Sequence, residues 1–281
     1  MTTGTTTHEN PVIVAGAGPT GMTAALALQA RGVPVTILER DPEDRDRPGS
    51  RAIFVHGETL AVLEYTHPGL GSRLADAGLV WPTRRTLWRG KEVFERTYAS
   101  PGGRDELPHF TSLPQVRTES FMLDALADAG VEIHWETPVE GVTSTAEGVT
   151  VETAGGEEWT TPYLVGADGA GSAVRAEIGA DFEGEQSPNS FIVVDVEEHP
   201  DDPRPRERVF HYDHPAVDGR NVLLVPFEGG WRVDIQCLDT DDPDHLASDA
   251  VIADLVGTVL GERYADRITW VSTYQFLQVM A

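Results

Sequence analysis

The spacing of hydrophobic and polar residues changes several times along the chain, and each change predicts an element. Near the N-terminus, the consecutive apolar residues Val12, Ile13 and Val14 predict a buried parallel strand. An alanine-rich stretch over residues 19–31 then predicts a helix that packs closely on that strand, and residues 33–39 predict a second strand. The first forty residues therefore predict a strand–helix–strand unit.

The next part of the first half mixes helical and strand patterns. Residues 59–78 predict one or two short helices broken at a Pro-Gly pair, and residues 80–98 alternate around an Arg-Gly turn, which is typical of a hairpin. We expect Thr118 to cap a helix that ends at Gly130. Residues 131–166 then predict a strand, a three-stranded antiparallel meander and a return strand.

After about residue 185 the pattern becomes mainly strands, with one helix near 247–258. This predicts a second, mainly antiparallel sheet. In a simple NAD dehydrogenase domain, further strand–helix–strand units would directly follow the first one. The long gap before the next nucleotide-like motif argues against that class.

A glycine-rich turn lies inside the first strand–helix–strand unit. Gly16, Gly18 and Gly21 have the spacing that permits a tight turn, close approach of a diphosphate, and close packing of the helix on the strand. The helix N-terminus that follows suits a diphosphate. Glu39 ends the second strand, where a carboxylate can accept hydrogen bonds from ribose hydroxyls, and Arg40 follows it. Glu39 disfavours a 2′-phosphate, and NAD and FAD both stay open from these residues alone.

Composition and charge exclude some classes of binding partner. The chain has 281 residues and a formal net charge of −25, which repels nucleic acid and anionic membranes. We find no run of apolar residues long enough to span a membrane and no secretory signal, and a single cysteine, Cys237, fits a reducing cytoplasm. The acidic stretches, including the one at residues 41–49, are interpreted as solvated loops.

Three later motifs add candidate cofactor contacts. Arg51 follows the acidic loop, and Gln115 stands just before the predicted helix. An apolar strand then ends in Asp168 and Gly169 and leads into a short helix that carries Arg175. The carboxylate can bind ribose or ribityl hydroxyls, and the arginine can face a phosphate.

With these motifs, the sequence resembles the single-component FAD-dependent aromatic hydroxylases of the p-hydroxybenzoate hydroxylase type, in the branch that acts on phenols and aromatic polyketides. The resemblance implies an α/β fold, with a glutathione-reductase-like FAD-binding Rossmann domain and an antiparallel β-sheet substrate domain. It implies domains at 1–185 and 186–281, with segment 80–110 contributing to the substrate side. It also implies FAD contacts from the residues named above, with NADPH or NADH as the reductant.

One family feature is not found. The family carries a third motif, Gly-Asp followed by small residues, after the substrate sheet, and residues 268–281 resemble the strand just before it. We therefore expect that a C-terminal segment is missing, that another polypeptide supplies it, or that the protein has a lesser function. A homo-oligomer is also possible as a partner state. We expect the chain alone to bind FAD weakly.

The resemblance implies a cytoplasmic monooxygenase that hydroxylates a small aromatic substrate with O2. Alternatives are a truncated, non-catalytic binder of flavin or an aromatic ligand, and a halogenase or reductase of the same fold. His211, Tyr212 and His214 are weak catalytic candidates, because alternation along a strand sends neighbouring side chains to opposite faces. We expect no metal site and no contact with nucleic acid or membrane.

Overall fold

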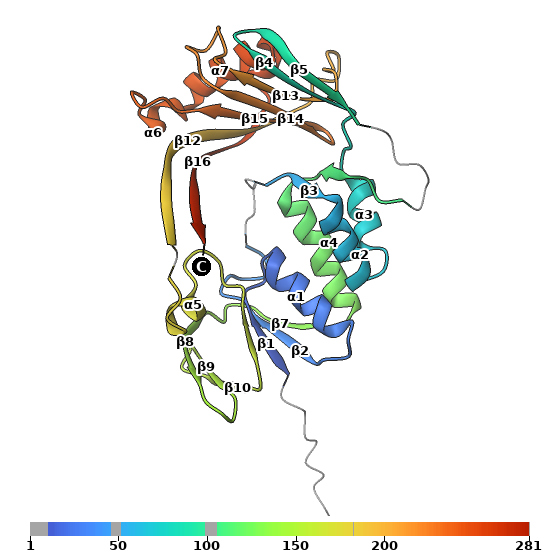
Figure 1. The fold of residues 1–281 in the computed structure, drawn as a ribbon, viewed down its shortest axis with the longest axis vertical. Helices are drawn as coiled ribbons and strands as arrows, with labels where there is room; N and C mark the ends of the chain where they lie inside the picture. The colour runs from blue at the N-terminus through green and yellow to red at the C-terminus, as the bar shows by residue number, and fades with distance from the viewer. Residues whose placement is uncertain (1–10, 46–51, 99–105, 182, 281) are drawn as a thin grey trace, which may run out of the picture.

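A helix-covered parallel sheet and a large, mainly antiparallel sheet are stacked along the long axis of the molecule (Figure 1). The structure, a computed structural model, describes residues 11–45, 52–98, 106–181 and 183–280. Arg51 lies outside the described residues. None of the described helices is both long and apolar enough to cross a membrane.

The parallel sheet forms around the glycine-rich unit. Its strand order is β11-β1-β2-β7, and every neighbouring pair is parallel. The strands are β1 (Val12–Ala15), β2 (Val35–Leu38), β7 (Glu132–His134) and β11 (Leu164–Gly166). β1 and β2 are buried along their whole length, as their unbroken apolar runs predict.

Four helices gather beside this sheet (Figure 1). They are α1 (Pro19–Gln29), α2 (Gly57–Thr66), α3 (Leu70–Ala77) and α4 (Gln115–Asp128). Leu26, Leu60 and Leu126 share one buried core with β1 and β2. The predicted break between α2 and α3 is confirmed, because Gly69 adopts a left-handed φ of 88° there.

The expected helix start at Thr118 is wrong. α4 begins at Gln115 after Pro114, whose ring sets φ at −52°, and the Thr118 N–H already donates to the Pro114 carbonyl at 3.1 Å. Thr118 is therefore inside the first turn rather than at its cap. Gln115, expected just before the helix, is its first residue.

Smaller sheets flank this body. A two-stranded sheet joins β3 (Phe54–His56) to β6 (Phe110–Ser112). The predicted meander is confirmed and is followed by a short helix: the elements are β8 (Val139–Ser144), β9 (Val149–Thr153), β10 (Glu158–Thr161) and α5 (Ala173–Glu177).

The large sheet has seven strands in the order β16-β12-β15-β14-β13-β4-β5. They are β4 (Thr83–Trp88), β5 (Lys91–Thr97), β12 (Glu183–Glu197), β13 (Glu207–Tyr212), β14 (Val222–Phe227), β15 (Gly230–Gln236) and β16 (Ile268–Met280). The predicted hairpin is confirmed as β4 and β5, which turn at Arg89 and Gly90. Only the β4–β13 pair is parallel, and it joins segments that are far apart in the sequence.

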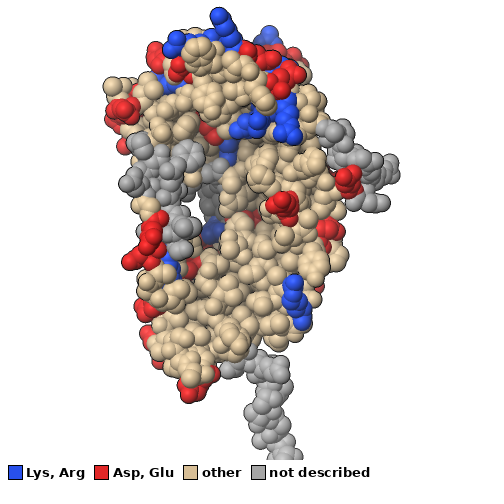
Figure 2. All heavy atoms as spheres, viewed as in Figure 1, with Lys and Arg blue, Asp and Glu red and all other residues tan. Residues whose placement is uncertain are grey.

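The two faces of this sheet differ in chemistry. Alternate residues such as Val194, Leu224 and Val233 form an apolar core with helix α7 (Asp249–Leu260), which covers the side turned away from α1–α4 (Figure 1). The short elements α6 (Pro243–Leu246) and η1 (Glu262–Tyr264) flank α7. The intervening residues of the strands form the opposite face, which is turned toward β3. Figure 2 shows basic and acidic side chains together over the upper part of the visible face, where the seven-stranded sheet lies.

Candidate functional site

The first candidate site is a cavity of about 210 Å³ at the carboxyl ends of β1, β2 and β11. Ligands of open parallel sheets bind at such an edge. The cavity brings together six of the predicted cofactor residues: Gly16, Gly18, Glu39, Arg40, Asp168 and Gly169. Residues more than 120 positions apart in the sequence therefore line the same space.

Each glycine of the turn is needed for a different physical reason. Gly16 has a φ of 100°, and a Cβ there would overlap the carbonyl of Ala167; a Cβ on Gly21 would overlap the carbonyl of Gly16. Gly18 has open space in front of it, an ordinary φ of −78°, and no side chain that caps α1. Gly16 and Gly21 thus allow the turn to close, whereas Gly18 leaves the helix N-terminus open to an anion.

Glu39 is 5% exposed and its carboxylate is part of the cavity wall. The Ala17 N–H donates to one carboxylate oxygen at 2.5 Å, and the Asp41 N–H donates to the other at 3.0 Å. These contacts aim the carboxylate across the turn, which is where the nucleotide's ribose was predicted.

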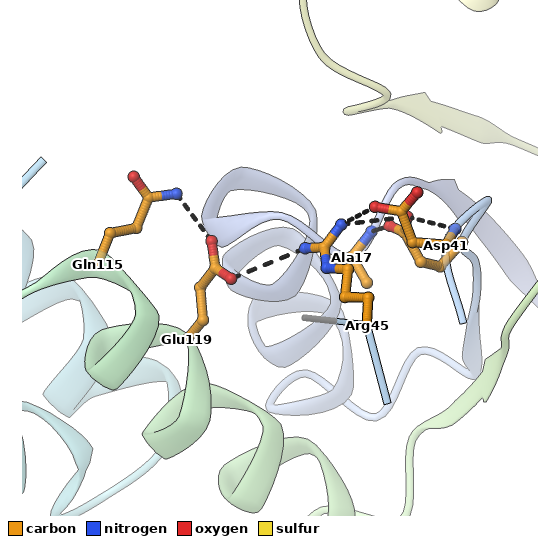
Figure 3. A network of polar contacts seen from close by, with 6 residues as sticks. Ala17, Asp41, Arg45, Gln115 and Glu119 are labelled. Atoms are coloured by element: carbon orange, nitrogen blue, oxygen red, sulfur yellow. Dashed lines mark hydrogen bonds and ion pairs between the residues drawn. The ribbon is translucent and has the colours of Figure 1, made fainter. Parts of the chain in front are cut away.

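Arg45 is a site residue that the sequence analysis missed. Its guanidinium pairs with Asp41 and lies 3.8 Å from both Glu39 and Glu119, so it bridges the loop after β2 to helix α4 (Figure 3). The acidic stretch around it was interpreted as a solvated loop. The signal in the sequence was weak, because Arg45 is one of several arginines among the carboxylates close behind Glu39.

Gln115 does not line this cavity. Its side-chain amide donates to the buried Glu119 at 2.7 Å, and Glu119 in turn faces Arg45 (Figure 3). Gln115 is thus linked to the cavity wall through Glu119 and Arg45. Its predicted contact with the flavin stays a prediction.

Asp168 caps helix α5 in this structure. Its carboxylate accepts hydrogen bonds from the Ser172 hydroxyl at 2.5 Å, from the Ala173 N–H at 2.7 Å and from the Val174 N–H at 3.2 Å. Arg175 donates to the Ala170 carbonyl at 3.0 Å. Asp168 lines the cavity while it holds the start of α5, and the predicted phosphate contact of Arg175 stays a prediction.

A second cavity, of about 420 Å³, lies between β3 and the polar face of the seven-stranded sheet. Its aromatic wall comes from Phe54, Trp81 and Tyr98; the Trp81 and Tyr98 rings meet edge to face, with their centroids 5.6 Å apart. The charged wall of this cavity is formed by Arg84, Arg208, Arg232 and Asp234. A flat ring with a polar group fits such walls.

The three weak catalytic candidates are placed differently. Of the residues on β13, Arg208 lines the second cavity rather than His211 or Tyr212, and His214 follows the strand. Burial and the nearby His214 lower the pKa of His211 to about 4, so its ring is neutral at physiological pH. Their catalytic role stays a prediction.

Comparison with known proteins identifies the family. The model of the FAD binding domain matches residues 9–281, which is nearly the whole chain. The chain belongs to the FAD-binding domain family. This membership decides between the two nucleotides that the glycine spacing left open, and FAD is the cofactor. Residues Gly18 and Glu39 fit it, because they offer an open helix N-terminus and a buried acceptor in one cavity.

Relatives within the FAD-binding domain family include the 6-methylpretetramide 4-monooxygenase of Streptomyces rimosus, 32% identical over 283 residues, which cover 96% of this chain and 48% of that protein. A flavin-dependent monooxygenase of Mycobacteroides abscessus is 34% identical over 185 residues, 62% of this chain and 38% of that protein. The chain thus spans less than half the length of these curated relatives.

Solved structures share the fold. The p-nitrophenol 4-monooxygenase of Pseudomonas putida has a TM-score of 0.79 at 24% identity, over 96% of this chain and 69% of that one. Aklavinone-11 hydroxylase, solved with FAD and aklavinone, has a TM-score of 0.77 at 19% identity, over 98% of this chain and 55% of that one. The predicted α/β fold, an FAD-binding Rossmann unit with a second, mainly antiparallel sheet, is confirmed.

Proposed function

We propose that the chain is the FAD-binding part of a monooxygenase that hydroxylates an aromatic substrate, phenolic or polyketide, with NADPH or NADH and O2. The observation that supports this is the pairing of an FAD cavity with an aromatic-walled second cavity in one chain. FAD, when bound, supplies the redox chemistry and the activation of O2. The relatives reported above are monooxygenases, which favours hydroxylation over the halogenase, reductase and non-catalytic alternatives.

The residues of the first cavity have binding roles in this proposal. Gly18 admits the diphosphate to the N-terminus of α1, and Glu39 accepts hydrogen bonds from ribose hydroxyls. Arg45 holds the loop after β2 against α4, so that Glu39 keeps its direction. Arg40, Arg51, Gln115, Asp168, Gly169 and Arg175 remain proposed contacts to FAD or to the nicotinamide coenzyme.

The second cavity supplies the substrate side. Its aromatic wall can stack on a flat ring and exclude water from it. The names of two relatives, which refer to 6-methylpretetramide and aklavinone, support a polycyclic aromatic substrate. A cytoplasmic location suits an enzyme that consumes NADPH or NADH, and a neighbour solved in a tetrameric form supports a homo-oligomer.

The test is retention of FAD by the purified chain. We expect Glu39→Ala to weaken FAD binding about tenfold or more, because two ribose hydroxyls lose an acceptor whose charge strengthens each bond. Flavin fluorescence titration measures the dissociation constant. Glu43→Ala, which removes an exposed carboxylate from the same loop, is the matched control and should bind FAD like the parent. Equal binding by the Glu39→Ala variant and the parent would remove Glu39 from the site.

A further inference from the structure

The charged wall of the second cavity is formed by the face of the seven-stranded sheet opposite α7. Arg208 on β13 lies in register with Arg84 on β4, two strands away from Asp234 on β15. Leu223 and Val225 of β14 form an apolar floor between the arginines and β15. The charges thus surround a patch that a flat ring can cover.

One arginine on this face is held by an ion pair. Arg232 is almost fully buried and makes two parallel hydrogen bonds of 2.8 Å with Asp195 on β12. A bidentate pair of this kind balances its own charge. The remaining charged groups of the wall are Arg84, Arg208 and Asp234.

These three groups lack such partners. Within the described residues, the Arg84 Nε and the Asp234 Oδ1 are both inaccessible to solvent and make no hydrogen bond. In the same part of the chain, the Arg208 side chain makes no hydrogen bond or ion pair. Burial lowers the pKa of Arg208, and the positive charge of the neighbouring Arg84 lowers it further. Buried polar groups of this kind cost free energy until a ligand satisfies them.

The carboxyl of Asp234 is tuned to exchange a proton near neutral pH. Its pKa is raised to about 7, mainly by burial; Arg232 and Arg208 oppose the rise, and Asp195 adds to it. Arg84, His56 and Tyr98 are the other charged or titratable groups that line the cavity. A proton acceptor works best when its pKa is close to the working pH.

We propose that Asp234 takes the proton of an aromatic hydroxyl group that enters this cavity, and that Arg84 and Arg208 hold the resulting oxyanion. The proton moves from the ligand oxygen to the Asp234 carboxylate, so the total charge in the cavity is unchanged. The proposal rests on the proposed hydroxylase function for its purpose, since a phenolate ring is richer in electrons than a phenol. Asp234 thereby becomes a candidate catalytic base.

The test counts protons on binding of 2-naphthol at pH 8 to the full chain loaded with oxidised FAD. Difference absorption spectra report whether the bound naphthol is ionised, and calorimetry in buffers of different ionisation enthalpy reports the protons released. We expect an ionised ligand with almost no proton released by the parent, because Asp234 receives it. With Asp234→Asn we expect close to one proton released, because the amide cannot accept it. His56 and Tyr98 are present in both proteins, so the difference isolates Asp234.

The second arm uses 2-naphthoate, which is already an anion and needs no base. We expect Arg208→Gln to weaken its binding about tenfold, and Asp234→Asn to leave it unchanged or tighter. Arg208→Lys should recover part of the affinity. Arg206→Gln, which removes an exposed arginine paired with Glu228, is the matched control, and thermal unfolding checks that each variant is folded.

Two results would overturn the proposal: a bound 2-naphthol that stays neutral in the parent, or equal proton counts for the parent and Asp234→Asn. Neither measurement needs turnover or coenzyme. Failure of the proposed monooxygenase function would instead appear as absent hydroxylation by the FAD-loaded chain, so the two failures are distinguishable.

Discussion

Glu39 is buried, whereas Asp234 is half-buried with one buried carboxylate oxygen, and the surroundings of the two carboxylates differ. The Glu39 carboxylate accepts two backbone hydrogen bonds, from Ala17 and Asp41, and is therefore anchored before any ligand arrives. Asp234 keeps a buried oxygen that no described residue satisfies. At the scale of the residue, the first group is preorganised to bind and the second stores a desolvation cost that a ligand can relieve.

The desolvation cost of the Asp234 carboxylate predicts that the stability of the fold depends on pH. The pKa of Asp234 is raised from about 3.8 to about 7 in the fold, so the native state binds its proton more tightly than the unfolded state does. The free energy of unfolding therefore falls as pH rises from about 4 to 7, and the loss is complete above pH 7. We expect Asp234→Asn to remove this loss and to be more stable than the parent at pH 8 by roughly 1–3 kcal/mol. Urea unfolding at pH 5 and pH 8 measures it.

The matched control is Asp239→Asn, which removes an exposed carboxylate beyond the end of β15. Its stability relative to the parent should be the same at both pH values. A stability difference between Asp234→Asn and the parent that does not change with pH would contradict the raised pKa.

The sequence could predict residues whose role depends on local spacing. Glu39 and the three glycines lie within one strand–helix–strand unit, and the structure places Gly16, Gly18 and Glu39 in one cavity. Arg45 and Asp234 could not be found in this way, because Glu119, which faces Arg45, and Arg208, which lies near Asp234, come from distant segments. The parallel pairing of β13 with β4, which brings Arg208 beside Arg84, leaves no signal in either strand alone.

At the scale of the element, the turn between β1 and α1 needs glycine at one position so that the chain can fold and at another so that the cofactor can approach. Gly21 faces the carbonyl of Gly16, whereas Gly18 faces open space. Local patterns predicted this unit well because its contacts are short in sequence. The same patterns misplaced the start of α4 at Thr118, because a proline in the cap position leaves no polar side chain to recognise.

These two requirements predict opposite outcomes for two similar substitutions. We expect Gly21→Ala to lower the free energy of unfolding by about 2 kcal/mol or more, because the new methyl overlaps a backbone oxygen that cannot move freely. Gly18→Ala should keep the parent's stability in the absence of FAD, since its φ is ordinary and no atom lies within 4 Å of the new methyl. It should weaken FAD binding instead, because the methyl occupies the approach to the helix N-terminus.

Chemical unfolding without FAD and flavin titration separate the two effects. Gly32→Ala tests a different cost, because its φ of 72° strains any side chain although the space around it is open. Gly18→Ala that binds FAD as tightly as the parent would show that the diphosphate does not approach this residue.

At the scale of the whole molecule, the chain has two large apolar cores that share no residue. One joins α1–α4 to the parallel sheet, and the other joins α7 to the seven-stranded sheet. The FAD cavity borders the first core, whereas the second cavity lies where the large sheet meets β3. The sequence predicted both bodies from their periodicities, but their contact depends on side chains from β3, β4 and β13 that no local pattern brings together.

Two separate cores predict two unfolding transitions. Leu126 and Leu260 are both almost fully buried, one in each core, and each Leu→Ala change should cost about 2–5 kcal/mol. We expect Leu126→Ala to lower the transition that FAD raises, and Leu260→Ala to lower the other one, because a ligand stabilises only the body that binds it. Differential scanning calorimetry with and without FAD resolves the two. If a single transition carries both losses, the two bodies unfold as one cooperative unit, and β3 of the first body then stays against the seven-stranded sheet until the whole chain unfolds.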